Sequence, residues 1–368
     1  MDHGMPPSEP RKIGPIAARG TRADIQMRHA TNPSPATRCQ TRITPSSRRG
    51  ICEWPARSGY QDEQIGGKSN AFIDNKKADE TFILLFGRRG AAYKNLIDKI
   101  IPRTVTYYHQ FISDDVFEAW VNSDRFDVSE CNQILASELI DKAHLAANTA
   151  LFRSKQWMDA ACLSYMGDNF VGWASAIRGL TENAGDILDG LMNIGPALAD
   201  NKIIIRAALL RRHHDHRIDF SQIDMTLDHY VLAKWMRAPK GDVLKAKDNI
   251  EYVRMLECGK VPRIVEFYQR LCGITHPSSL SINYAFETTD SGTRLRFDQE
   301  RENIDKLIGE FPNILESLVA FSFNAPLIIL RVLHIFKRHP KIPELRNLNW
   351  HEIPAWKSVE ESLKRDRY

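Results

Sequence analysis

The sequence predicts a mainly α-helical protein: a helical bundle with one small β-hairpin near residues 280–297 and a disordered basic N-terminal segment. Three observations predict this architecture. Apolar residues recur at spacings of three and four over much of residues 129–337. The period changes to two only near residues 280–297. Residues 1–75 show no apolar period at all.

The charge distribution separates the start of the chain from the rest. The protein has 368 residues, 43% of them hydrophobic, and a net charge of +4. Residues 1–59 hold ten Lys or Arg against four Asp or Glu, so they carry +6 and the remaining chain carries −2. Residues 1–75 are rich in Pro, Ser, Thr, Arg and Gly and are expected to be disordered. This segment is either a tail that contacts RNA or acidic partners, or an upstream extension from a misassigned start codon.

Two long helices are expected in the middle of the chain. The first covers residues 129–165, with Ser129 as a candidate cap, and its apolar face holds Leu135, Leu139, Ala143, Ala146 and Ala150. The second begins near Phe170 and is ended by Gly195-Pro196. Its face is the clearest in the chain and consists of Phe170, Trp173, Ile177, Leu180, Ala184, Ile187 and Leu191.

Shorter elements complete a helical domain over residues 76–345, with its core in 129–338. Helices are expected near residues 202–212, 221–236, 242–257 and 262–272. Asp290-Ser291-Gly292 predicts the turn of a hairpin, and a helical stretch over 300–337 is broken near Pro312. Residues 346–368 form a tail that is either a short charged helix or frayed.

Cysteine and hydropathy patterns favour a cytoplasmic protein without a membrane span. The six cysteines show no CxxC spacing, which is typical of free thiols in a reducing compartment. The apolar stretch over 314–336 is interrupted by Glu316, Asn324, Pro326, Arg331 and His334. Such interruptions favour a buried core helix over a helix in lipid.

Gly87-Arg88-Arg89-Gly90 has the spacing of the GxxG loop of KH domains, whose glycines let the backbone approach phosphates. A KH domain needs a three-stranded sheet around that loop, and the sequence around it does not predict one. A glycine-capped turn between helices is therefore favoured. RNA binding through this loop and the basic tail is a weaker functional hypothesis than the two that are developed from Arg270 and His276.

Arg270 and His276 form an Arg–His step at the end of a predicted helix, which Gly273 and Pro277 close. Five other Arg–His pairs of similar spacing occur in the chain, so spacing alone identifies no site. The context is more specific. An earlier helix carries Arg178 and Glu182 in an Arg-x-x-x-Glu step, and the later segment continues the pattern with Tyr268, Leu271, Cys272, His276 and Pro277. Over residues 129–283 the chain resembles uncharacterised bacterial HEPN-like helical proteins.

This resemblance implies a homodimeric, metal-independent endoribonuclease of the toxin or phage-defence type. In that role Arg270 holds the scissile phosphate, His276 moves protons, and Arg178, Glu182 and Tyr268 orient them. Leu271 follows Arg270 where the strongest HEPN nucleases usually have a polar residue. The alternative is therefore a non-catalytic helical module that uses the same pocket to bind a partner protein or a nucleotide. If Arg178 and Glu182 take no part in catalysis or ligand binding, they are an ordinary i,i+4 ion pair.

The segment over residues 211–217, RRHHDHR, is the other dense cluster. Arg211, Arg212, His213 and His216 are candidates for contact with RNA phosphates. An ordinary solvated loop is the main alternative. A metal site is disfavoured because at most His213 and His216 share a helix face. No metal or cofactor is predicted. The absence of P-loop, Rossmann, GxSxG and HExxH patterns argues against those enzyme classes.

Overall fold

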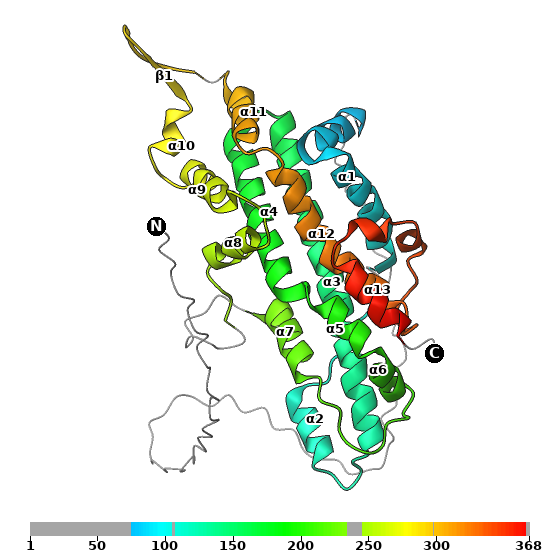
Figure 1. Cartoon of the computed structure of the whole chain (residues 1–368). Helices are drawn as coiled ribbons and strands as arrows, with labels where there is room; N and C mark the ends of the chain where they lie inside the picture. Colours follow the sequence, from blue (N-terminus) through cyan, green and yellow to red (C-terminus); the bar gives the residue numbers. More distant parts are fainter. Residues whose placement is uncertain (1–74, 105–106, 234–244, 297, 366–368) are drawn as a thin grey trace, which may run out of the picture. The chain divides into compact units, whose positions relative to one another are not determined.

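The computed structural model describes residues 75–104, 107–233, 245–296 and 298–365, all within one compact unit (Figure 1). The predicted mainly α-helical bundle with a small hairpin is confirmed in this part of the chain. The N-terminal segment predicted to be disordered lies outside the described residues, apart from Asn75, where the first helix begins.

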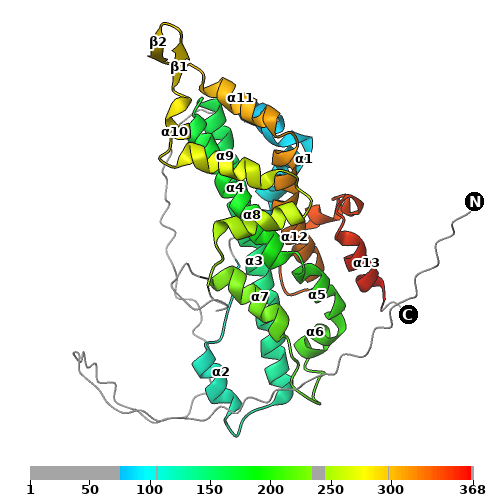
Figure 2. The same cartoon turned by 60° about the vertical axis from the view of Figure 1, so that its left-hand side comes forward.

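Two long helices, α3 (Val128–Met166) and α4 (Phe170–Leu191), run side by side through the centre of the helical unit (Figures 1 and 2). All seven residues of the predicted α4 face are buried, because an apolar stripe with a period of 3.6 must pack against neighbours. Asp127, and not Ser129, caps α3: its carboxylate accepts a hydrogen bond from the Glu130 amide at 2.8 Å. The Ser129 hydroxyl instead donates to Asp127.

The third central helix is α12 (Ile314–Leu333), which packs against α3 and α4. Within the described residues it is the one helix that is long and apolar enough to cross a membrane by length and composition. In this structure 67% of that apolar window is buried, as in the core helix of a bundle. The helix break predicted near Pro312 is confirmed, since α11 (Glu300–Glu310) ends before it.

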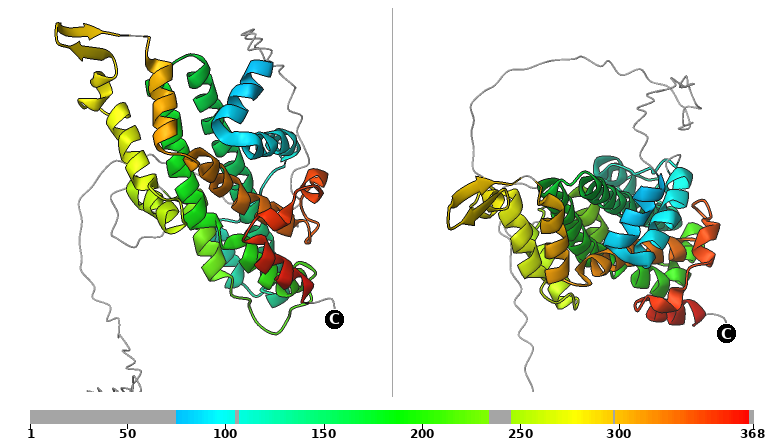
Figure 3. Two further views of the ribbon diagram at one scale, coloured as in Figure 1. Left: turned by 45° about the horizontal axis from the view of Figure 1, so that its top comes forward. Right: turned by 90° about the horizontal axis from the view of Figure 1, so that it is seen from above.

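The helix α1 (Asn75–Thr104) packs against α3 and α12 and bends at Gly87, where φ is +71° (Figure 3). That value lies in the left-handed region, which glycine enters at little cost. The segment Gly87–Gly90 is thus a kink between two helical stretches, as the glycine-turn alternative predicted. The only strands among the described residues are the two of the hairpin, so no KH sheet surrounds it there.

Shorter helices cover the central three. The helices α8 and α9 pack on α4, α6 and α7 pack on α3, and α13 packs on α5. Their bounds are α2 Asp114–Val121, α5 Ile194–Asp200, α6 Lys202–Leu209, α7 Ser221–Leu232, α8 Asn249–Cys258, α9 Ile264–Thr275, α10 Leu280–Asn283 and α13 Trp356–Lys364. Two 3-10 turns, η1 (Pro343–Arg346) and η2 (Trp350–Glu352), precede α13.

One local prediction needs correction. Gly195-Pro196 does not end α4, which stops at Leu191. The pair lies in the first turn of α5, where the backbone amide that proline lacks would have no helical partner. For the C-terminal tail, the helical alternative holds over its described part, because α13 forms there with Trp356 and Val359 buried.

The hairpin consists of β1 (Phe286–Thr289) and β2 (Gly292–Leu295), paired antiparallel from Phe286 opposite Leu295 to Thr289 opposite Gly292. Asp290 and Ser291 form the two-residue turn, as predicted. The hairpin lies next to α10 and α11 and projects away from the helical bundle (Figure 2).

Gly185 marks the closest approach of α4 to α8. A Cβ atom built there would lie 2.3 Å from the backbone carbonyl oxygen of Tyr252. Backbone cannot yield as a flexible side chain can, so only glycine lets these two helices pack at this distance.

We expect Gly185→Ala to destabilise the protein by about 1–3 kcal/mol, because α8 must move outward to make room for the methyl group. Gly309→Ala in α11 is the matched control. Its added Cβ meets no atom within 4 Å, so the better helix propensity of alanine should be neutral or stabilising by about 0.5–1 kcal/mol. Urea denaturation monitored by circular dichroism measures both. Equal stability of Gly185→Ala and wild type contradicts the packing argument.

Candidate functional site

Three of the five residues predicted as a catalytic group come together between α4 and α9. The Tyr268 hydroxyl donates to Glu182 Oε1 at 2.7 Å, and Arg178 Nε lies 3.1 Å from the same oxygen. The Arg178 guanidinium carbon is 5.9 Å from the centroid of the Tyr268 ring. Burial, followed by the bond to Glu182, raises the pKa of Tyr268 above its usual range. The hydroxyl therefore keeps its proton at neutral pH. Arg178 contributes an ion pair to this group, while its buried Nε has no hydrogen-bond partner among the described residues.

Arg270 and His276 lie elsewhere. Arg270 is two positions beyond Tyr268, which turns it about 200° around α9. It approaches Glu310 of α11 at 3.5 Å and lines a cavity of about 280 Å³ there. His276 is the exposed C-cap of α9, and within the described residues its imidazole has no hydrogen-bond partner. No described contact joins either residue to the Arg178–Glu182–Tyr268 group.

The RRHHDHR segment forms a turn held to α3. Asn132 donates hydrogen bonds to the backbone carbonyls of His213 at 3.2 Å and His216 at 2.9 Å. Arg211 forms an ion pair with Glu130 at 3.0 Å. Of the four residues predicted to contact nucleic acid, Arg212 is the one that lines the large cleft described next.

A cleft of about 950 Å³ lies between α6, the C-terminal end of α12, residues 334–346 and α13. We call it the basic cleft. One carboxylate, Glu360, lines it. Its eight cationic side chains come from four separate segments and are Lys202, Arg206, Arg212, Arg331, Lys337, Lys341, Arg346 and Lys364.

Six of these cations have no carboxylate partner among the residues that the structure describes. Lys364 pairs with Glu360 at 2.8 Å, and the Lys202 ammonium donates to the Ser362 carbonyl. In the described part of the chain, no carboxylate lies within ion-pair distance of the other six. Protein interiors and clefts rarely concentrate one sign of charge without a partner. The arrangement therefore favours a bound anion.

The cations of the basic cleft affect the pKa of His334, whose imidazole also lines the cleft. Burial, together with the charges of Arg331, Arg346 and Lys341, lowers the pKa of His334 to about 4. Its Nε2 accepts a hydrogen bond from the Ile342 amide at 3.1 Å. The ring is thus neutral at physiological pH and holds the chain that carries two of those cations.

The wall of the basic cleft is also partly apolar. Ile203 lies in α6 and Leu210 directly follows it, and both line the cleft. Their side chains are 59% and 56% exposed. Large apolar side chains left open beside cations suit a ligand that has a flat apolar part and charged groups.

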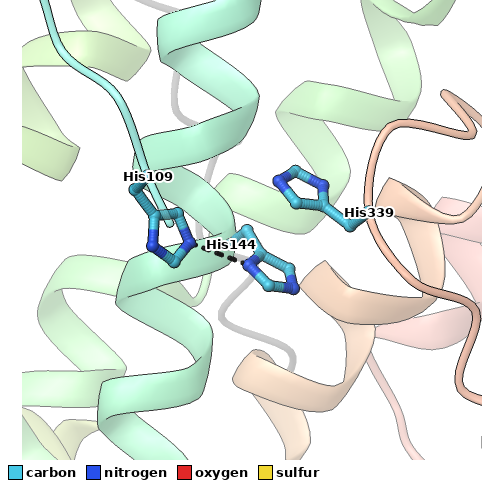
Figure 4. Close-up of side chains that lie close together, drawn as sticks. All are labelled: His109, His144 and His339. Atoms are coloured by element: carbon cyan, nitrogen blue, oxygen red, sulfur yellow. Dashed lines mark hydrogen bonds between the residues drawn. The ribbon is translucent and has the colours of Figure 1, made fainter. Parts of the chain in front are cut away.

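A second group of residues is a buried histidine cluster that consists of His109, His144 and His339 (Figure 4). One ring nitrogen of each lies within 4.8 Å of one on both others. His109 Nε2 and His144 Nδ1 are 2.9 Å apart and share a hydrogen bond. The rings of His144 and His339 stack with centroids 3.9 Å apart. Burial, together with the two neighbouring imidazoles, lowers the pKa of His144 to about 3.

Asp141 of α3 anchors one side of this cluster. Its carboxylate accepts from His339 Nε2 at 2.9 Å, from Arg338 at 3.1 and 3.2 Å, and from the Tyr107 hydroxyl at 3.3 Å. Burial alone raises the pKa of Asp141, but the hydrogen bonds from His339 and Arg338 outweigh it and lower the pKa to about 2. Asp141 is therefore charged throughout the physiological range.

Neither the basic cleft nor the histidine cluster could be predicted from the sequence. Each joins segments on the two sides of a gap of more than a hundred positions, between Arg212 and Arg331 in the cleft and between His144 and His339 in the cluster, so no local spacing connects them. The one available signal was His144, which stands inside the small-residue face of α3 between Ala143 and Ala146.

No protein-family model matches this chain, and neither does any curated protein or solved structure. The HEPN resemblance stays a prediction.

Proposed function

We propose that this helical protein binds a phosphorylated nucleotide in the basic cleft. The observation that carries the proposal is the convergence on one concave site of six cationic side chains that have no carboxylate partner among the described residues. The sequence also predicted a nucleotide as one alternative ligand, but in the pocket of Arg270 and His276, neither of which lines the basic cleft.

Electrostatics favours a phosphate ligand. Like charges held near one another repel, and an anion with several negative oxygens relieves that repulsion. Arg206, Arg331 and Arg346 offer planar guanidinium groups, which bind phosphate oxygens through two parallel hydrogen bonds. The lysines of the cleft add point charges that suit a polyphosphate.

Size and composition favour a nucleotide over a longer polymer. Small-molecule sites enclose about 300–1,000 Å³, and the cleft lies within that range at about 950 Å³. Ile203 and Leu210 offer apolar surface to a base. The chain after residue 59 carries a net charge of −2, so the cations in the cleft are a local concentration and not part of a generally basic domain.

We expect the full-length protein to bind ATP or GTP more tightly than the monophosphates, and not to bind the free nucleosides measurably. The double variant Arg206→Ala/Arg346→Ala should bind at least about tenfold more weakly, because each charged hydrogen bond to phosphate contributes about 1.5–3 kcal/mol. Isothermal titration calorimetry at two salt concentrations measures this, with weaker binding at the higher salt.

Lys357→Ala is the matched control, since Lys357 is an exposed cation of α13 outside the cleft lining. It should bind like wild type. Wild-type affinity of the double variant contradicts the site. If tripolyphosphate binds as tightly as ATP, the proposed contact between the base and the apolar wall of the cleft is contradicted. A single-stranded RNA that binds while nucleotides do not makes the cleft an RNA surface and overturns the nucleotide proposal.

The ribonuclease expected from the HEPN resemblance is a second candidate. Two observations favour it: His276 presents an exposed imidazole, and the Arg270 side chain is 48% exposed on the same helix. Within the described chain the two do not meet in one pocket. A second copy of the chain would have to complete the site, as the resemblance implies.

If this candidate is correct, purified wild type should cut transfer RNA in EDTA, and His276→Ala and Arg270→Ala should both be inactive, since one moves the proton and the other offsets phosphate charge. Gel electrophoresis of the RNA measures cleavage, and a thermal melt of each variant checks that it is folded. His214→Ala, an exposed histidine far from α9 in the sequence, is the control. Cleavage by His276→Ala at the wild-type rate rules out this assignment.

A further inference from the structure

We propose that His109, His144 and His339 bind one divalent transition-metal ion, with zinc as the expected metal and water in the fourth position. This site is separate from the basic cleft, and the inference does not rest on the proposed nucleotide binding. The sequence alone predicted no metal site.

The distances suit three imidazole ligands. In a tetrahedral zinc site with Zn–N bonds of about 2.0–2.1 Å, ligand nitrogens lie about 3.4 Å apart. Here the His109–His144 nitrogen pair is 2.9 Å apart, and the three ligand atoms all lie within 4.8 Å of one another. The spacing itself needs shifts of at most about 1.4 Å. Because the His144 and His339 rings stack with an interplanar angle of 6°, one of the two rings must also rotate out of the stack before both nitrogens face the same ion.

An unpartnered nitrogen is the second, independent observation. His339 is 93% buried, since 7% of its surface is exposed, and its Nδ1 has no hydrogen-bond partner among the described residues. Its Nε2 is held by Asp141 at 2.9 Å. A buried acceptor without a partner is costly, and a metal ion would occupy that lone pair. A carboxylate that orients the other nitrogen is the usual outer partner of a metal-bound histidine.

The ligand set selects the class of metal. Neutral imidazoles suit zinc, cobalt, nickel and copper, whereas magnesium and calcium take oxygen ligands. The hydrogen bond between His109 and His144 would give way to two metal bonds through a change of tautomer.

Three ligands leave one coordination position. The Tyr107 hydroxyl stands nearby but donates to Asp141, so it does not fill that position. His109 is the partly exposed member of the cluster and gives solvent a route to the ion. An open position with bound water is typical of catalytic zinc, whereas structural zinc has four protein ligands.

The ion would also connect three segments of the chain. His109 follows α1, His144 belongs to α3, and His339 follows α12. A ligand that binds only the folded state stabilises it in proportion to the logarithm of its concentration over Kd. Zinc should therefore raise the melting temperature of the protein, and a chelator should lower it.

The experiment uses full-length protein freed of metal by dialysis against a chelator. Zinc is titrated by calorimetry, and cobalt is titrated as a spectroscopic probe by its visible absorption. We expect one zinc per chain and a tetrahedral cobalt spectrum. His109→Ala should weaken zinc binding by more than about 100-fold, while Asp141→Asn, which removes an orienting charge, should weaken it by about 10–100-fold.

His213→Ala/His216→Ala is the matched control, because it removes a neighbouring pair of imidazoles whose rings are 4.6 Å apart and lie outside the cluster. It should bind zinc like wild type. His109→Ala is chosen because His109 is the most exposed ligand, and its fold is checked by circular dichroism. Absence of zinc binding by folded wild type overturns the proposal. So does unchanged binding by His109→Ala, or loss of binding in the control alone.

Discussion

The buried carboxylate of Asp141 is the interaction on which the functional part of the structure depends. Asp141 is 1% exposed on α3, and it is bound by Arg338 and His339, which follow α12. Removing one partner of a buried pair of this kind costs about 3–5 kcal/mol, a cost that is smaller on the Arg338 side because that side chain is 37% exposed. The pair holds the chain against α3 as it leaves the core, so residues 334–346 take one fixed path.

That path places two sites next to each other in the chain. Residues 334–346 supply Lys337, Lys341 and Arg346 to the basic cleft and His339 to the histidine cluster. His334 lies between the two: it lines the cleft, and it also helps to lower the pKa of His144. An ion in the cluster would add positive charge beside the cleft and favour an anion there. The two proposals therefore stand on separate observations but predict mutual reinforcement.

The central helices could be predicted from the sequence because their burial is periodic. The face of α4 was identified residue by residue, and the hairpin turn at Asp290-Ser291 followed from its residue types. Prediction from local residue types was wrong where two candidates for one role lie within a few residues, since Asp127 and not Ser129 caps α3. The sites could not be predicted, because Arg206, Arg346 and Arg331 meet only after α6, α12 and the C-terminal segment pack together. The conspicuous RRHHDHR run, in contrast, is largely engaged by Asn132 and Glu130.

The most direct test of the account is hydrogen–deuterium exchange of the full-length protein with and without saturating ATP. The account predicts that ATP slows amide exchange in residues 202–210 and 334–346, which form the two sides of the basic cleft. Exchange in the hairpin over 286–295 should not change. If ATP binds and exchange in both cleft segments stays the same, or slows only along α9, the assignment of the ligand to the basic cleft is contradicted.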